Sequence, residues 1–171
     1  MADYEHVELL RRIAHGVPVS ATLVAEAAGD YADNDVVSNA VANGTGDPIE
    51  FASAVRDTGG AGKIIGATIA CNEDGILATS RLHLFSQAPT ASEMDDNAAF
   101  SLGAADLPYY LGFVPFAAMA DFGAGSFALD ALTEDLLVRA AATTLYGILQ
   151  FTDAETNETA GMIFTIVLYV A

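Results

Sequence analysis

The stretch 59–63, GGAGK, has the residue types of a phosphate-binding loop, in which glycines precede a lysine. Its spacing does not fit that pattern. Asp57 stands where the first glycine is required, and Ile64 follows the lysine where a serine or threonine must hold magnesium. The loop also leads into an apolar run typical of a strand, which offers no helix N-terminus for phosphate. We therefore expect these glycines to begin a strand and to bind no nucleotide.

Nucleophilic or metal chemistry would depend on one cysteine and three histidines. Cys71 lies in the apolar run IIGATIAC, which favours a buried, inert thiol and allows no disulfide within the chain. His6, His15 and His83 are far apart in the sequence, and RLHLF supplies one histidine where a metal site on a strand needs two and an acid. We expect His83 to be an ordinary exposed or hydrogen-bonded histidine, and we predict no catalytic residue, metal or cofactor, so that the protein is not an enzyme.

Two acidic clusters supply carboxylates of the kind that bind calcium. They are Asp30, Asp33 and Asp35 in DYADND, and Glu93, Asp95 and Asp96 in EMDDN. The first cluster lacks the spacing and the central glycine of the helical calcium loop. Solvated turns are the preferred interpretation, and calcium remains the alternative.

Aromatic side chains gather in DLPYYLGFVPF, at Tyr109, Tyr110, Phe113 and Phe116. Aromatic residues bury large areas, so packing in a core is the default expectation. A platform that stacks on sugars, or a contact with another protein, remains open. A lectin-like module would use Tyr109 and Tyr110 together with calcium held by nearby acids.

The chain is strongly acidic, with 23 Asp and Glu against 6 Lys and Arg and a formal net charge of −17. Such a surface repels nucleic acid and anionic lipid, so neither is an expected partner. Acidity also promotes solubility. With 171 residues, 53% of them hydrophobic and 17% charged, the chain is expected to form one domain with a substantial core.

Residues 3–15 have the pattern of a short amphipathic helix. Val7, Leu10 and Ala14 share one face, Asp3 is a suitable N-cap and Gly16 a suitable stop. No window has the length of a signal peptide or of a membrane span, so a soluble protein is expected. We expect a helical arm at 1–16 and a β-sandwich domain at 17–171.

From residue 17 onward, short apolar or alternating runs are separated by turn residues, which predicts strands. The expected strands are 17–27, 36–42, 49–55, 63–71, 76–86, 113–119, 126–130, 136–142, 144–151 and 162–170. Asp74-Gly75 predicts a hairpin between the fourth and fifth of these, and 152–161 a hairpin between the last two. A helical turn is expected near Ala104 to Leu107.

No alternation of strands with helices occurs, so the expected fold is an all-β antiparallel β-sandwich, jelly-roll-like, with a short N-terminal helix. The run 162–170 is apolar on both faces, as in a central strand or a strand covered by a neighbour. On 76–86, Arg81, His83 and Phe85 share one face. That mixed face is predicted to lie outside or at an interface.

Four segments in this order resemble small structural proteins of tailed-phage virions. They are GGAGKIIGATIACNEDGI, SRLHLFSQAPTASEMDDNAAFSL, DLPYYLGFVPF and TLYGILQFTDAETNETAGMIFTIVLYV, within residues 50–171. The resemblance lies in the order of the segments and does not include the N-terminal arm. It implies a β-sandwich virion component, present in several copies and without catalytic residues.

Together, pattern and resemblance predict a capsid decoration (cement) protein on the capsid exterior, made in the host cytoplasm. Its expected partners are the major capsid protein and further copies of itself. A tail, neck or fibre component is the alternative of the same class, and a lectin-like carbohydrate-binding module is the alternative of a different class.

Overall fold

The structure is a computed structural model that describes residues 16–26, 29–40, 46–130, 132, 134–156 and 159–171. The helix predicted at 3–15, in the arm 1–16, lies outside these residues. The described residues form eleven strands and one 3-10 turn, so the all-β prediction is confirmed. None of them belongs to a helix with the length and hydropathy needed to cross a membrane.

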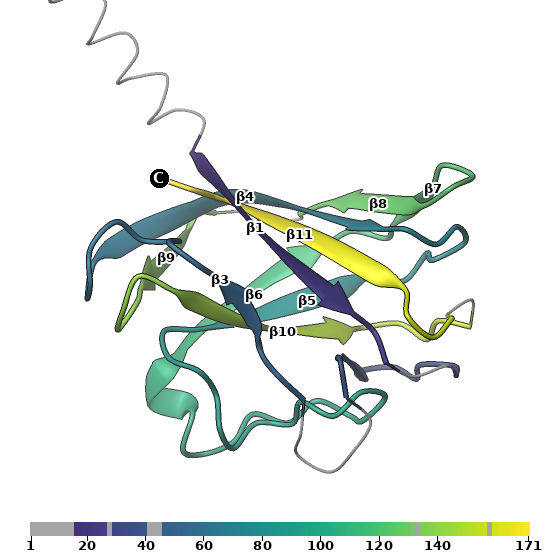
Figure 1. The fold of residues 1–171 in the computed structure, drawn as a ribbon, viewed down its shortest axis with the longest axis horizontal. Helices are drawn as coiled ribbons and strands as arrows, with labels where there is room; N and C mark the ends of the chain where they lie inside the picture. The colour runs from purple at the N-terminus through teal and green to yellow at the C-terminus, as the bar shows by residue number, and fades with distance from the viewer. Residues whose placement is uncertain (1–15, 27–28, 41–45, 131, 133, 157–158) are drawn as a thin grey trace, which may run out of the picture.

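The strands form two antiparallel sheets that pack against each other (Figure 1). The first sheet has the order β1 (Val17–Val24), β11 (Ile163–Val170), β4 (Ala61–Cys71), β8 (Ser126–Leu129) and β7 (Ala120–Asp121), and β9 (Leu136–Arg139) pairs with the start of β4. The second sheet has the order β2 (Val36–Val37), β10 (Leu145–Phe151), β5 (Ser80–Phe85) and β6 (Tyr110–Phe116), and β3 (Ile49–Phe51) also pairs with β10.

The core lies between the sheets because each strand turns alternate side chains inward. On β11, Phe164, Ile166 and Leu168 are fully buried, and Thr165 between them is exposed. The rings of Phe164 and Phe151 meet edge to face from opposite sheets, with centroids 5.9 Å apart. Each fully buried side chain of this size stabilises the fold by about 1.5–3 kcal/mol. β11 lies between β1 and β4, which confirms the prediction of a central strand.

Both predicted hairpins are wrong. β4 belongs to the first sheet and β5 to the second, and β10 and β11 are likewise divided between the sheets. Gly75 does adopt the positive φ of a turn, at 77°. The following amides of Leu77 and Ala78, however, donate to the Glu155 carboxylate instead of to a neighbouring strand. The turn signal is local, whereas the choice of sheet depends on burying apolar faces from distant segments.

Two other local predictions are confirmed, with shifted bounds. A 3-10 turn (η1, Leu107–Tyr109) lies near the predicted helical turn. The glycines of 59–63 begin a strand, since β4 starts at Ala61. Gly59 has φ +72°, and the Gly60 amide donates to the Asp57 carbonyl at 2.7 Å. A Cβ at Gly60 would lie 2.6 Å from that same carbonyl oxygen, so the tight turn requires glycine.

Candidate interaction surface

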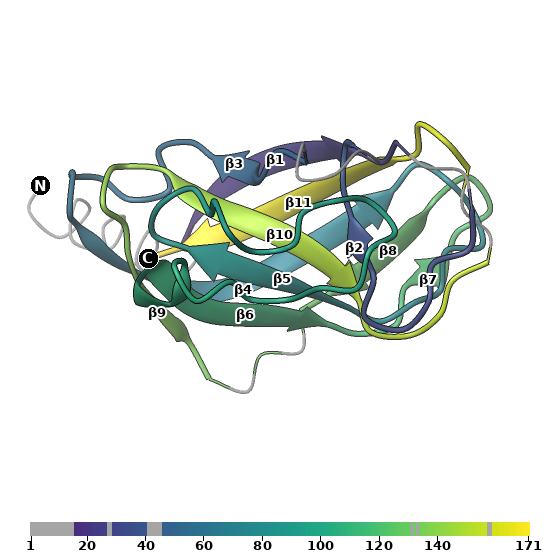
Figure 2. The same ribbon diagram turned by 90° about the horizontal axis from the view of Figure 1, so that it is seen from below.

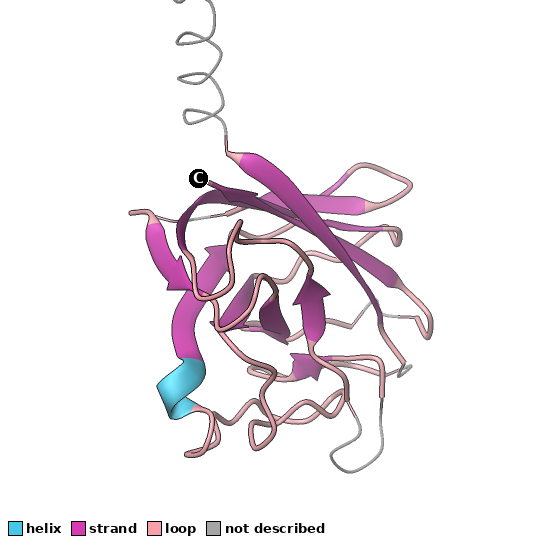
Figure 3. Ribbon diagram, turned by 60° about the vertical axis from the view of Figure 1, so that its left-hand side comes forward, coloured by secondary structure: helices cyan, strands magenta, loops and turns pink. Residues whose placement is uncertain are grey.

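The outer face of the second sheet is covered by the chain itself. Residues 86–109, the covering segment, lie across β10, β5 and β6 on the side away from the first sheet (Figures 2 and 3). Val36, Phe85 and Ile148 are buried there, and Met94, Phe100, Leu102, Tyr110 and Tyr146 pack against them. On the mixed face of β5, His83 and Phe85 are therefore buried by this segment, whereas Arg81 is exposed. The predicted position outside or at an interface is wrong for His83 and Phe85 and is confirmed for Arg81.

His83 is the polar centre of this covered face and is 5% exposed. Its Nε2 lies 2.9 Å from Gln150 Oε1, and its Nδ1 lies 3.0 Å from the Tyr110 hydroxyl. Gln150 Nε2 donates to the Asn34 carbonyl, so Oε1 faces His83 and Nε2 of the imidazole is the donor. The Phe100 ring stacks on the imidazole at 3.9 Å. Burial lowers the pKa of His83, so the structure favours a neutral, fully hydrogen-bonded histidine.

A buried carboxylate closes the covering segment on itself. Asp106 accepts hydrogen bonds from the amides of Thr90, Ala91 and Ser92 and from the Ser92 hydroxyl, at 2.7–3.0 Å. Burial alone would raise the pKa of Asp106, but these hydrogen bonds outweigh it and hold the pKa below its ordinary value. Asp106 is therefore a structural anchor.

The two acidic clusters are only partly the solvated turns that were predicted. Asp96 is buried and accepts hydrogen bonds from the Tyr31 hydroxyl at 2.8 Å and the Ser38 amide at 2.7 Å. Asp35 is buried too, and its Oδ2 accepts from the Ala32 amide. Asp30 and Asp33 remain exposed. Among the described residues, no group of three His, Cys, Asp or Glu side chains is placed to hold a metal ion.

The four aromatic residues of 109–116 have different roles. Phe116 is in the core, and Tyr110 packs on Phe85 with its hydroxyl bound to His83. Tyr109 and Phe113 are 37% and 40% exposed, and the Arg81 guanidinium lies 4.8 Å from the centre of the Phe113 ring. Core packing, the default prediction, is thus confirmed for Phe116, and the structure leaves Tyr109 and Phe113 for contact with another molecule.

Cys71 and His83 lie too far apart in the fold to act together. Cys71 is buried on the core side of the first sheet, as predicted, whereas His83 lies on the outer side of the second. Burial raises the pKa of the Cys71 thiol, which disfavours the reactive thiolate.

Lys63, the lysine of the glycine stretch 59–63, forms an ion pair with Asp135, with Nζ 2.5 Å from Oδ2.

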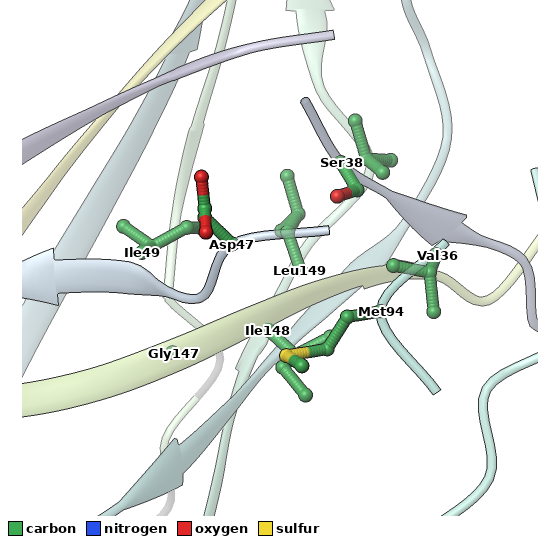
Figure 4. Close-up of a pocket in the computed structure, with 9 residues that line it drawn as sticks. Val36, Ser38, Asp47, Ile49, Met94, Gly147, Ile148 and Leu149 are labelled. Carbon is green, nitrogen blue, oxygen red and sulfur yellow. The ribbon is translucent and has the colours of Figure 1, made fainter. Parts of the chain in front are cut away.

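Two hollows in the described part of the chain are too small for an ordinary ligand. The first lies among β2, β3 and β10, lined by Val36, Ser38, Asp47, Ile49 and Met94 (Figure 4), and its volume of about 10 Å³ would hold at most a single water. The second, beside β1 and β3, is open and measures about 220 Å³. Ligand pockets usually measure about 300–1,000 Å³.

The outer face of the first sheet, the open face, carries no charged side chain on β1, β11 or β8. Its residues are Pro18, Ser20, Thr22, Val24, Ile163, Thr165, Val167, Tyr169, Ile65, Gly66, Thr68, Ala70, Phe127 and Leu129. One row across the strands reads Thr22, Thr165, Ala70 and Phe127, and the next reads Ser20, Val167, Thr68 and Leu129.

Several large apolar side chains of the open face are exposed, among them Leu129 at 60% and Val24 at 46%. Charges lie at its margin. They include the Asp130 carboxylate, which accepts from the amides of Ala67 and Leu132, the Lys63–Asp135 ion pair, and Arg139 on β9. An uncharged face of several strands is unusual on a chain with a net charge of −17, and such patches mark contacts between proteins.

Sequence reasoning did not single out the open face, although part of its signal is visible in the sequence. Positions 18, 20, 22 and 24 and positions 163, 165, 167 and 169 contain no charged residue. Which alternate positions face outward, and which strands are neighbours, required the structure.

Charge also differs between the two ends of the sheets. One end, the acidic end, lies at the right of Figure 1 and consists of residues 26, 29–35, 72–79, 121–125, 152–156 and 159–162. These loops lie together because the strands next to them are paired, at Val24–Ile163, Cys71–Ser126 and Ser80–Phe151. The acidic end contains Glu26, Asp30, Asp33, Asp35, Glu73, Asp74, Asp121, Asp153 and Glu155, and these described loops contain no Lys or Arg.

The opposite end consists of residues 52–60, 134–135 and 139–144, with Gly16, Lys63 and Ala171 beside them. Here Arg56, Lys63 and Arg139 accompany Asp57, Glu134 and Asp135, so the charges are nearly balanced. Val17 pairs with Val170, so β1 begins and β11 ends here. The described chain therefore starts and finishes at its less acidic end.

No protein-family model matches the chain, and no curated protein matches it.

Proposed function

We propose that this protein is a non-enzymatic virion structural protein, a capsid decoration (cement) protein that binds the outside of the major capsid protein lattice. The observation that carries the proposal is the unequal charge of the two ends. A decoration protein stands crowded among copies on a shell, where an acidic outward end limits aggregation of particles. We infer that the acidic end faces solvent and the opposite end faces the lattice.

Three further observations support a role in binding protein. The hollows described above are smaller than ligand pockets. His83, Asp96 and Asp106 are taken up by hydrogen bonds that hold the fold. The resemblance of residues 50–171 to tailed-phage structural proteins indicates the same class.

We also propose that the fold is a jelly-roll β-sandwich. The order β1-β11-β4-β8 in one sheet and β2-β10-β5-β6 in the other supports this topology. In a jelly roll, chain segments pass from one sheet to the other, as the connections β4 to β5 and β10 to β11 do. Jelly rolls occur in viral capsid and lectin domains, so the topology favours this class of function without identifying it.

Co-sedimentation of the purified protein with shells that lack it tests the proposed function. We expect saturable binding at a fixed ratio to the major capsid protein. Occupancy at one vertex or along the tail would instead support the tail, neck or fibre alternative, and no binding to any part of the particle would contradict both.

Matched charge reversals test the orientation. Arg56 and Asp74 are both exposed, at the opposite and acidic ends respectively. Arg56→Glu should weaken shell binding by up to about ten-fold, because interfacial charges tune association. Asp74→Lys should leave binding unchanged. The reverse pattern would show that the acidic end faces the lattice.

A further inference from the structure

We propose that the open face is a contact between two copies of this chain, which pack first sheet against first sheet. This inference rests on the proposed function in one respect: a decoration protein is present in several copies on one shell, which gives the copies a reason to meet. Its evidence is separate, because it concerns the flank of the molecule and not its ends.

Charge favours a second copy as the occupant. Two chains of net charge −17 repel each other through most of their surfaces. The open face is the large exception, because its rows of Thr, Ser, Ala, Val, Leu and Phe carry no carboxylate, and the Asp130 carboxylate at its margin already accepts from two amides. Stacking through this face also leaves the acidic end of each copy in solvent.

The size of the open face reaches the lower limit for a specific contact. β1 and β11 each have eight residues, and four neighbouring strands take part. The strands β1, β11, β4 and β8 have 8, 8, 11 and 4 residues. With about 3.4 Å per residue and about 4.8 Å between strands they give roughly 500 Å² on each copy, or about 1,000 Å² in a pair. Specific interfaces begin at about 1,000–1,200 Å².

The side chains of the open face suit a two-fold arrangement. On β8 Phe127 and Leu129 are large and exposed, and on β1, at the other side of the open face, the outward residues Ser20 and Thr22 are small. A two-fold axis between the two middle strands, β11 and β4, would place β8 of each copy over β1 of the other. The same patch would then be used on both copies, as in the commonest kind of homodimer.

Sedimentation of the full chain at physiological salt, over a wide range of concentration, tests this inference. We expect the mass to rise from 17.7 kDa toward twice that value. Leu129→Asp should weaken self-association at least about ten-fold, because it buries an unpaired charge in the contact. Leu77→Asp is the matched control: Leu77 is 53% exposed, close to the 60% of Leu129, but lies at the acidic end. It should associate like the wild type.

A wild-type chain that remains monomeric at every concentration would overturn the inference. So would equal effects of the two substitutions, since this would assign the contact to another surface. Circular dichroism of each variant verifies that it is folded, and both replaced side chains are exposed. Shell binding is measured separately, so failure to self-associate and failure to bind shells are distinguishable results.

Discussion

The outer faces of the two sheets differ in what covers them. On the second sheet, the covering segment 86–109 places Met94, Phe100 and Leu102 over β5 and β10. On the first sheet, Leu129 and Val24 remain exposed in the described structure. Both faces are apolar enough to be buried, and only one of them is buried by the described part of its own chain.

The difference shows how this fold separates stability from contact. The covered face contains buried polar groups that have partners within the chain, as His83 has in Gln150 and Tyr110. The open face contains few groups that need a partner, because its polar side chains are mostly the hydroxyls of Ser and Thr, which water or another protein can satisfy equally well. The first face contributes to folding, and the second is suited to assembly.

The largest effect is expected from removing the anchor of the covering segment. Asp106→Ala would leave the amides of Thr90, Ala91 and Ser92 and the Ser92 hydroxyl without their acceptor, and of these three residues Ser92 is buried. Since each unsatisfied buried donor costs about 1–3 kcal/mol, and water can reach the exposed Thr90 and Ala91, we expect the two donors of Ser92 to account for a loss of about 3 kcal/mol in the free energy of unfolding. Urea denaturation measures it. A loss below about 1 kcal/mol would show that the segment is held mainly by its apolar contacts.

A smaller loss is expected from truncating the ring that covers His83. Phe100 is half-buried and stacks on the imidazole. Phe100→Ala should cost about 2 kcal/mol, less than for a fully buried ring. Thermal and urea unfolding of the variant provide the measurement. Faster hydrogen exchange in β5 and β10 would locate the effect on the covered face.

Much of this contrast could not be predicted from the sequence. Strands such as 162–170 were predictable because alternation or continuous apolar character is local. The pairing of strands was not, because the Asp74-Gly75 turn signal says nothing about which sheet receives β5. His83 was assigned to a mixed outer face because Met94 and Phe100, the residues that bury it, come from a segment without regular structure. The open face was missed because absence of charge at alternate positions becomes meaningful only when the neighbouring strands are known.

The covered face should also make stability sensitive to mild acid. Burial lowers the pKa of His83, so the folded chain keeps the imidazole neutral in mild acid. In the unfolded chain the imidazole has its ordinary pKa of about 6.5 and becomes protonated below that pH. The unfolded state then binds more protons, so the free energy of unfolding should fall as the pH drops below about 6.5 and be unaffected by this group above that value.

The substitution His83→Gln removes this titration. Its unfolding free energy should therefore vary less with pH than that of the wild type just below about pH 6.5. Asp106, whose pKa is lowered, contributes stability that is lost only at more acidic pH, below the ordinary carboxyl value of about 3.9. If the free energy of unfolding varied equally with pH in the wild type and in His83→Gln, between about pH 3.9 and about pH 6.5, His83 would be excluded as the cause of the acid sensitivity.

The smallest effect on folding is expected on the open face. Leu129→Ala removes a side chain that is 60% exposed and should change the stability of the dilute protein by no more than about 0.5 kcal/mol. Compared with Phe100→Ala under the same conditions, this substitution measures how differently the chain uses its two faces. Equal losses would contradict the distinction between them.

Small-angle X-ray scattering of the full chain at physiological salt tests most directly whether the open face joins two copies. A single chain of 171 residues has an expected radius of gyration of about 16 Å. Two copies stacked with their first sheets about 10 Å apart should give about 20 Å. A value near 20 Å that falls toward 16 Å in Leu129→Asp is the predicted result. A value of about 16 Å for the wild type at every concentration would contradict it.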